Sequence, residues 1–286
     1  MKNIIFHNFK TILIVCALLF IFNVYGALSF FGGDYGLFSI YFLNVGQGDS
    51  ELIVFPTGAR VLIDGGPANG AVAREIGSIF HPWDRAIDIA IVTHPEEDHF
   101  GGLVDLYDRV PVGAVLSSGI EKESGGFEYF KEKTREMNIR EIKIAKGDIL
   151  WHGSARMDVL WPEKDAQSMP TNDAGIVIRF EAADVKILFT GDIGGAVEKK
   201  IAREVGDVHI LKVGHHGSKY SSTDNFLRVI RPEIAVIESG RNSYGHPSEE
   251  ALRRIIDYGS RIFRTDTDGT IRIDIFDGKA SIYALH

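Results

Sequence analysis

Short runs of apolar or alternating residues, separated by glycine-rich turns, begin at residue 37 and continue to the end of the chain. The early runs are rich in β-branched and aromatic residues, which predicts strands at residues 38–46, 50–58, 59–66 and 87–94. The first of them are spaced closely enough for hairpins. Apolar residues at helical spacing predict helices at residues 71–80 and 127–138, with a weaker helix after Gly102.

The second half of the chain continues this alternation of strands and helices. Strands are predicted at residues 157–162, 174–182, 185–192, 209–216 and 233–240, and helices at residues 195–206, 223–231 and 247–259. Residues 261–285 alternate and contain two Asp-Gly pairs, which predicts terminal antiparallel strands. Because no Pro- or Ser-rich linker interrupts the pattern, we expect one α/β domain over residues 37–286.

The first residues have a different character. Lys2 and Lys10 precede a long apolar run at residues 11–33, and Asp34 follows it, so the rest of the chain is expected on the far side of a membrane. Residues 1–36 are therefore either a signal peptide, cleaved after Gly26, or an uncleaved N-terminal membrane anchor of about 20 apolar residues. Both interpretations predict an extracytoplasmic protein, secreted or anchored.

Composition limits the chemistry without deciding it. The 286 residues are 45% hydrophobic with a formal net charge of −8, so the surface as a whole does not indicate nucleic-acid binding, although a local basic patch can still serve phosphates. Cys16 is the single cysteine, which excludes a disulfide within the chain and zinc sites built from cysteine.

A crowded group of ionisable residues follows the apolar run IDIAIV. In THPEEDHFGG, residues 93–102, His94, Glu96, Asp98 and His99 stand where a buried strand should emerge into a loop. Packing alone does not explain so many charges in one tight loop, because burying them unpaired is costly. A bound cation that neutralises these side chains would explain why they lie so close together.

Further ionisable residues follow other strand-like runs in the same way. They are Asp64 in LIDGGP, Asp192 in FTGD, His215 and His216 in HHGS, and His246 in YGHPS. Ligands in α/β folds usually bind at the carboxyl ends of strands, so these segments are expected to converge on one edge of the sheets.

The order of the motifs FLNVGQGDS, LIDGGP, THPEEDHFGG, FTGD, HHGS and YGHPS resembles the metallo-β-lactamase superfamily. Within it, VGQGDS, HHGSK and YGHPS resemble the extracytoplasmic hydrolase domain of ComEC-type competence proteins and its stand-alone relatives. The resemblance covers nearly everything from residue 40 onward. It implies a four-layered αβ/βα sandwich with one or two divalent metal ions, zinc or manganese, at the edge of the two sheets.

The resemblance also implies roles for the metal ligands. His94 would bind the first ion, Asp98 and His99 the second, and Asp192 would bridge both, while His246 would complete the second site.

Other roles are implied around these ligands. Asp64 would orient a ligand from the second shell. Of His215 and His216, one would be a ligand or a proton donor to the leaving group and the other structural, and the sequence leaves open which is which. Asp98 is a candidate to manage the proton of the attacking water.

Two departures from the superfamily pattern concern the first ion. Glu96 would be a carboxylate ligand where the superfamily has histidine, and Asn172, a poorer ligand that would stand in the second shell, takes the place of the histidine that usually precedes the FTGD strand. With fewer nitrogens and more oxygens, the first site favours manganese or a loosely held ion, with zinc still open and a single-metal site an alternative.

Three basic residues flank the predicted site loops. Lys212, Lys219 and Arg241 are candidates to hold substrate phosphates.

The resulting hypothesis is an exported metal-dependent hydrolase, a phosphodiesterase or nuclease related to DNA-uptake domains, with DNA as a candidate substrate. In ComEC-type proteins this domain accompanies a multi-helix channel, so a separate channel protein is an expected partner. The alternatives are an esterase of envelope phosphoesters such as phosphocholine and a non-catalytic, membrane-tethered binding protein. A β-lactamase is disfavoured by Glu96 and Asn172.

Overall fold

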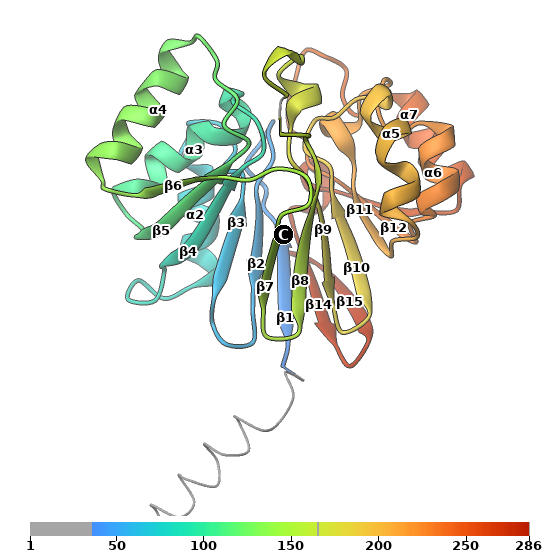
Figure 1. Ribbon diagram of the computed structural model, residues 1–286. Coiled ribbons are helices and arrows are strands. Elements are labelled where there is room, and N and C mark those ends of the chain that lie inside the picture. The colour runs from blue at the N-terminus through green and yellow to red at the C-terminus, as the bar shows by residue number, and fades with distance from the viewer. Residues whose placement is uncertain (1–35, 165, 286) are drawn as a thin grey trace, which may run out of the picture. The chain divides into compact units, whose positions relative to one another are not determined.

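Two β-sheets lie face to face with helices on their outer faces (Figure 1). The structure is a computed structural model that describes residues 36–164 and 166–285, which form one compact unit from Gly36 onward. The predicted signal peptide or anchor lies outside the described residues. Within those residues, no helix has the length and apolar character needed to cross a membrane.

The larger sheet has eight strands in the order β15-β14-β1-β2-β3-β4-β5-β6. Strands β3, β4, β5 and β6 run parallel, whereas β15, β14, β1, β2 and β3 pair antiparallel. The bounds are β1 Phe38–Phe42, β2 Glu51–Val54, β3 Arg60–Ile63, β4 Ile87–Val92, β5 Val112–Ser117, β6 Arg140–Lys143, β14 Thr270–Phe276 and β15 Lys279–Leu285.

The smaller sheet has seven strands in the order β13-β12-β11-β10-β9-β8-β7. Here β10, β11, β12 and β13 are parallel, and β7, β8, β9 and β10 are antiparallel. The bounds are β7 Ile149–His152, β8 Ala155–Trp161, β9 Val177–Ala182, β10 Val185–Phe189, β11 Ile210–Lys212, β12 Ile234–Ile237 and β13 Arg261–Arg264.

The helices divide between the two sheets. Helices α2 Ala71–Ile79, α3 Glu97–Tyr107 and α4 Gly125–Glu136 cover the larger sheet, and α5 Gly195–Val205, α6 Asp224–Ile230 and α7 Glu249–Asp257 cover the smaller one (Figure 1). Serine side chains cap two of them: Ser124 accepts from the Phe127 amide at 3.3 Å, and Ser248 accepts from the Ala251 amide at 3.2 Å. This arrangement is the predicted four-layered αβ/βα sandwich.

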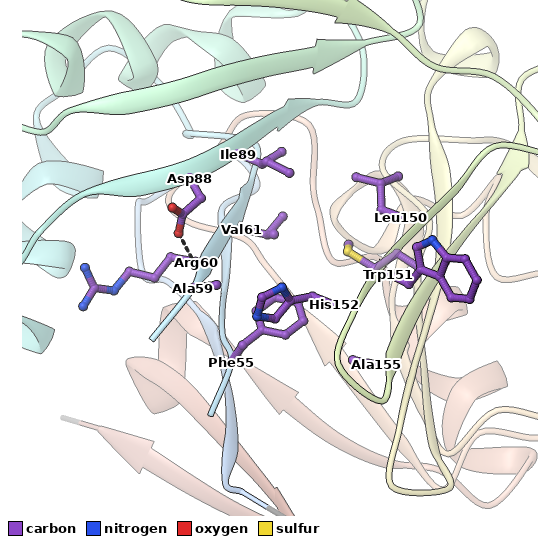
Figure 2. Close-up of a pocket in the computed structure, with 11 residues that line it drawn as sticks. Phe55, Ala59, Arg60, Val61, Asp88, Ile89, Leu150, Trp151, His152 and Ala155 are labelled. Carbon is purple, nitrogen blue, oxygen red and sulfur yellow. Dashed lines mark hydrogen bonds between the residues drawn. The ribbon is translucent and has the colours of Figure 1, made fainter. Parts of the chain in front are cut away.

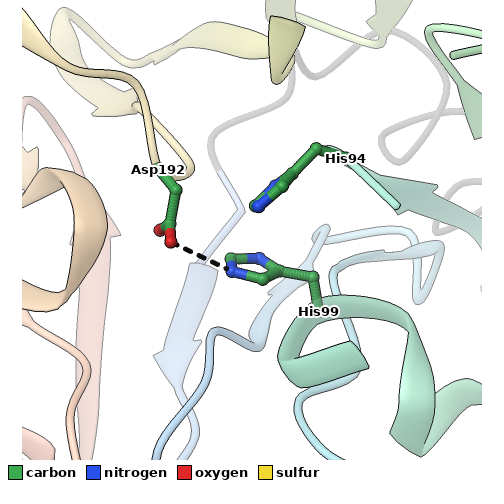
Figure 3. A group of neighbouring side chains, drawn as sticks. All are labelled: His94, His99 and Asp192. Atoms are coloured by element: carbon green, nitrogen blue, oxygen red, sulfur yellow. Dashed lines mark ion pairs between the residues drawn. The ribbon is translucent and has the colours of Figure 1, made fainter. Parts of the chain in front are cut away.

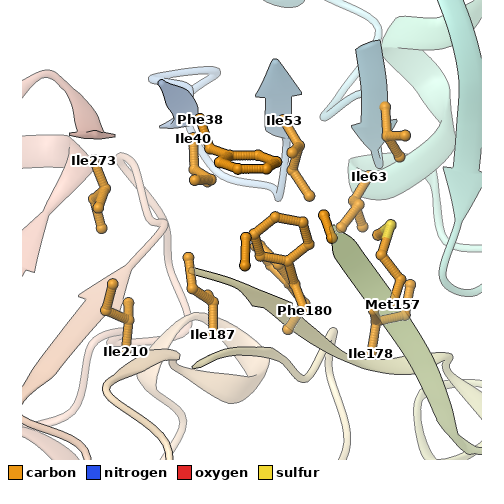
Figure 4. Packing of buried hydrophobic residues seen from close by; sticks show 14 of the residues in the cluster. Phe38, Ile40, Ile53, Ile63, Met157, Ile178, Phe180, Ile187, Ile210 and Ile273 are labelled. Atoms are coloured by element: carbon orange, nitrogen blue, oxygen red, sulfur yellow. The ribbon is translucent and has the colours of Figure 1, made fainter. Parts of the chain in front are cut away.

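The strand period of two separates the apolar layers. Phe38 and Ile40 of β1 point into the core between the sheets, where the Phe38 ring lies 6.2 Å from that of Phe180 (Figure 4). Tyr41, the residue after Ile40, packs on the opposite side under the helices. Burying each such side chain contributes about 1.5–3 kcal/mol, and because both faces of β1 are buried, the strand contributes to both apolar layers.

Several elements differ from the sequence prediction. We did not predict β5, β6 and β7, because their residues are only partly buried and lack a clear alternation. The prediction of terminal antiparallel strands was partly wrong: β13 runs parallel to β12 in the smaller sheet, and a short helix, α8 Thr265–Asp268, occupies the expected first turn. The β14–β15 hairpin, with its turn at Asp277 and Gly278, agrees with the prediction.

Helix α3 begins earlier than predicted. It starts at Glu97, so Asp98 and His99 lie on its first turn instead of in a loop. The helix comes close to the loop after β3: the Gly102 amide donates to the carbonyl of Gly66 at 2.8 Å, and a Cβ atom on Gly102 would overlap the carbonyl oxygen of Gly65. The two glycines of HFGG therefore permit the close approach that places His99.

We expect Gly102→Ala to lower the free energy of unfolding by about 1–3 kcal/mol, because the backbone of Gly65 must shift to admit the methyl group. Gly125→Ala is the control, since a Cβ atom there meets open space. Urea denaturation followed by circular dichroism measures both. Equal midpoints for the two variants would contradict the assigned contact.

Candidate metal centre

The predicted ligands meet where parallel strands of both sheets end. Asp64 follows β3, His94 follows β4, Asp192 follows β10 and His216 follows β11. Because β3 pairs in parallel with β4, and β10 with β11, the carboxyl ends of each pair lie at one edge of its sheet. The expected convergence of these segments is what the structure shows.

Two overlapping groups of side chains present ligand atoms to each other. His94, His99 and Asp192 form one (Figure 3), and Asp98, His99 and His216 form the other, with the atoms of each group within 4.8 Å. Asp192 Oδ2 lies 3.5 Å from His99 Nε2 and 3.5 Å from His216 Nε2. Asp192 therefore stands between the groups, as expected of a bridging ligand.

The donor atoms fit a divalent cation. The Nε2 atoms of His94, His99 and His216, and Oδ1 of Asp192, are buried without a hydrogen-bond partner among the described residues. Buried polar atoms almost always have partners, so three open imidazole nitrogens beside the Asp192 carboxylate indicate a shared ligand, whereas Asp192 Oδ1 itself faces Lys212 Nζ at 3.9 Å. Burial and the charge of His99 lower the pKa of His94 to about 3, which keeps that imidazole in the neutral form that binds metal.

Asp64 and Thr93 orient the two histidine rings from behind. Asp64 Oδ2 lies 2.7 Å from His99 Nδ1, and the Asp64 carboxylate accepts from the Thr93 amide at 2.8 Å and its hydroxyl at 2.6 Å. The Thr93 hydroxyl is in turn 3.0 Å from His94 Nδ1. With their Nδ1 atoms held, both rings turn Nε2 toward the centre, which is the second-shell role expected of Asp64.

The structure separates the two histidines of HHGS. Both have left-handed backbone conformations, with φ of 51°, a strained state that such sites retain for function. His216 is buried, with Nδ1 3.0 Å from the Glu238 carbonyl, so its Nε2 faces the ligand group. His215 is about a third exposed, with Nε2 3.8 Å from Asp192, and lines the pocket in front.

A pocket of about 300 Å³ opens in front of these ligands. Three other predicted residues line it without joining the two ligand groups. The His246 ring lies 5.4 Å from that of His215, Glu96 is ion-paired with Lys122, and Asn172 begins a short 3₁₀ turn, Asn172–Ala174. His246 and Glu96 therefore border the pocket, and of the two adjacent histidines His216 belongs to a candidate ligand group whereas His215 does not.

The assignment of Lys212 to substrate phosphate is wrong. Its side chain is fully buried behind the ligands, where Nζ pairs with Asp49 and donates to the Gly191 carbonyl at 3.1 Å. Although burial alone lowers the pKa of an amine, the carboxylates of Asp49 and Asp192 raise that of Lys212. A buried, paired ammonium cannot contact a substrate. Lys219 and Arg241 are exposed on loops beside the pocket, where the prediction for them still stands.

Sequence reasoning missed the buried carboxylates behind the centre. Asp49 Oδ1 lies 3.1 Å from His216 Nδ1, and Glu51 and Glu238 are buried beside it. Burial, then the charge of Asp49, raises the pKa of Glu238 to about 8. The available signal was an acidic residue within an apolar run, as in SELIVF and EIAVIES.

A second pocket, of about 240 Å³, lies between the β2–β3 and β7–β8 hairpins (Figure 2). Its lining is mainly apolar, from Phe55, Ile89 and Leu150, with Trp151 and His152 at its border. None of the predicted site residues lines it, so the candidate chemistry belongs to the first pocket.

Comparison with known proteins agrees with this geometry. A sequence model of the Metallo-beta-lactamase superfamily matches residues 43–240, which include most of the candidate ligands. The chain belongs to the metallo-beta-lactamase superfamily. The superfamily implies divalent metal ions, and the histidine and aspartate groups at the sheet edge could hold them.

Curated relatives of this superfamily member include competence proteins. It is 28% identical to ComE operon protein 3 of Bacillus subtilis over 279 residues, covering 91% of the chain and 35% of the relative. It is 29% identical to Recombination protein 2 of Haemophilus influenzae, over 84% of this chain and 29% of the relative. It is 27% identical to Competence protein ComA of Neisseria gonorrhoeae, over 82% of this chain and 32% of the relative. The chain thus spans about a third of the length of these relatives.

Solved structures of low sequence identity share the fold. The metallo-beta-lactamase fold protein YhfI from Bacillus subtilis superimposes with a TM-score of 0.57 at 10% identity, over 86% of this chain and 99% of YhfI. A diphosphatase from the PhnP family superimposes with a TM-score of 0.53 at 14% identity, over 84% of this chain and 99% of the diphosphatase.

We expect Asp64→Asn to weaken metal binding by about 10- to 100-fold, because the amide no longer holds His99 Nδ1 as a carboxylate does. Competition titration of the metal-stripped protein against a chelator measures the affinity. Asp277→Asn, in the exposed turn between β14 and β15, is the control. Unchanged affinity in Asp64→Asn would show that the ring is held by other contacts.

We expect Lys212→Met to lower the free energy of unfolding by about 3–5 kcal/mol, because it leaves Asp49 buried without its cation. Lys219→Met, on the exposed surface nearby, should change it by less than about 0.5 kcal/mol. Urea denaturation of both variants checks this difference. A Lys212→Met variant as stable as Lys219→Met would refute the ion pair as a structural element.

Proposed function

We propose that the protein is an extracytoplasmic metal-dependent phosphodiesterase, with DNA as its substrate. The observation that carries the proposal is the group of buried, unpartnered histidine and aspartate atoms at the sheet edge, of which Asp192 and His216 line an open pocket. The superfamily supports metal-dependent hydrolysis, and the competence relatives support a nucleic-acid substrate. Export is proposed from the basic and apolar pattern of residues 1–36.

The residues around the pocket suit an attack by water on phosphorus. Held by His94, His99, Asp192, Asp98 and His216, one or two divalent ions would supply an activated water and neutralise the charge that develops on the phosphate. Of these side chains, Asp98 is the carboxylate with appreciable exposure, 37%, and it borders the pocket. Its free oxygen can accept the proton of the attacking water.

His215 lies across the same pocket, in front of Asp192. Since its Nε2 is 3.8 Å from Asp192 Oδ2 and the side chain is 35% exposed, the ring can reach a bound substrate. We assign to it the proton delivered to the leaving oxygen. His216, whose two nitrogens face Glu238 and the ligand group, is held too tightly for that role.

The first ion position favours manganese over zinc in this proposal. Asn172 supplies an amide in place of an imidazole, and Glu96 offers a carboxylate that Lys122 already neutralises in part. With fewer nitrogen ligands and a partly neutralised carboxylate, the site offers harder donor atoms and binds its ion less tightly. A channel protein is proposed as a partner on the likeness to competence proteins.

We expect the metal-stripped protein to be inactive on bis(p-nitrophenyl) phosphate and single-stranded DNA, and to regain cleavage when manganese or zinc is restored. Asp98→Ala and His99→Ala should each lose more than about a hundredfold in kcat/KM, because each removes a ligand. His152→Ala, a histidine of the second pocket, is the matched control.

Two results would redirect the proposal. Stoichiometric metal uptake without cleavage of either substrate would favour an envelope phosphoester, and the absence of specific metal binding would favour a binding protein.

A further inference from the structure

Two loops border the metal pocket on the side of the smaller sheet. One covers residues 217–223 from the end of the HHGS turn, and the other covers residues 240–248 after β12. They are joined, since the Ser248 amide donates to the Gly217 carbonyl at 2.9 Å and its hydroxyl at 3.2 Å. The two loops therefore form one continuous rim, which we call the tyrosine rim after its two exposed tyrosines, Tyr220 and Tyr244.

The side chain of Asn242 makes four hydrogen bonds with the backbone of the second loop. Asn242 Nδ2 donates to the carbonyls of Gly240 at 2.9 Å and His246 at 2.6 Å, while Oδ1 accepts from the amides of Tyr244 at 3.0 Å and His246 at 3.1 Å. Tyr244 lines the metal pocket, yet its side chain is 76% exposed. Its ring lies 6.0 Å from that of His246. A well-held backbone thus presents a nearly free aromatic ring at the pocket.

The first loop is held in the same manner by Arg254 of α7. Its guanidinium donates to the carbonyls of Lys219 at 2.9 Å and Ser221 at 2.8 Å, and the Tyr220 carbonyl accepts from the Gly195 amide at 3.0 Å. Tyr220 is 71% exposed, and Lys219 Nζ lies 5.1 Å from its ring centroid. This loop also pairs a rigid backbone with an exposed aromatic ring.

Each loop carries one exposed tyrosine and one exposed cation. Lys219 accompanies Tyr220, and Arg241 accompanies Tyr244. Neither ring is needed for the fold, because the loop hydrogen bonds come from Asn242 and Arg254. Aromatic rings that stack on bases, interleaved with cations that hold phosphates, are the composition of surfaces that bind unpaired nucleic acid.

We propose that the tyrosine rim is a base-stacking platform for an unpaired nucleic-acid strand, with Tyr244 holding the base beside the phosphate that is cleaved. The inference rests on the proposed phosphodiesterase function and adds the form of the substrate. Tyr244 takes the position nearest the reaction because it lines the same pocket as Asp98 and Asp192. Bases of an intact duplex are stacked on each other and cannot reach the rings, so the platform selects single strands.

The test compares two strands of equal charge. The full chain, loaded with manganese, is given a thymidine 12-mer and a 12-mer of abasic residues, and kcat/KM is measured for each. We expect the base-bearing strand to be preferred by about tenfold or more, the magnitude of one stacked base. Tyr244→Ala should bring the ratio toward one, and Tyr244→Phe and Tyr244→Trp should preserve it. Tyr129→Ala, on the exposed face of α4, should keep the full preference.

Equal cleavage of both strands by the unaltered protein, or an unchanged ratio in Tyr244→Ala, would overturn the platform while leaving the phosphodiesterase intact. If neither strand is cleaved, the proposed function fails, and the platform is then tested only by how tightly the protein binds each strand. In that case fluorescence anisotropy with the same two strands must show the same preference and its loss in Tyr244→Ala. Equal binding of both strands, or no binding, would overturn it.

Discussion

The carboxylate of Asp64 joins the ends of two parallel strands, and the candidate metal centre depends on that connection. Asp64 follows β3, and its two oxygens bind Thr93 after β4 and His99 on the first turn of α3. All of these groups are buried, so water cannot compete for the hydrogen bonds. One side chain thereby sets the spacing of the strands, the start of the helix and the direction of the histidine ring.

A second layer of charge stands behind the ligands. Lys212 neutralises Asp49, and Asp49 faces His216 Nδ1, so the ring is held from the side opposite the pocket. Removing either charge would leave its partner buried and unpaired, which is more costly than losing a surface pair. The buried lysine thus fixes a candidate ligand, and the exposed cations of the loops remain the candidates for substrate contacts.

The division between rigid sheets and bordering loops also divides the functions we propose. The ligands come from strand ends and the first turn of α3, which the packed layers hold in place, whereas the exposed tyrosines and cations come from loops with polar supports. Substitutions in the loops can therefore change the proposed substrate selectivity without changing the proposed metal ligands.

The layers and the residue types of the candidate centre could be predicted from the amino-acid sequence, because both depend on local spacing. Alternation in β1 separates Ile40 from Tyr41, and His94, Asp98 and His99 lie within a few residues of each other. Only the tertiary structure decided what depends on contacts between distant segments. The sequence does not distinguish Lys212 from Lys219, yet Lys212 is buried against Asp49 and Lys219 is exposed. Likewise, His215 is partly exposed whereas the adjacent His216 is buried beside Asp49. The physical reason is that the burial and the ion pairs of a side chain depend on segments that are distant in the sequence. The spacing of residues within one segment carries no information about which other segment packs against it.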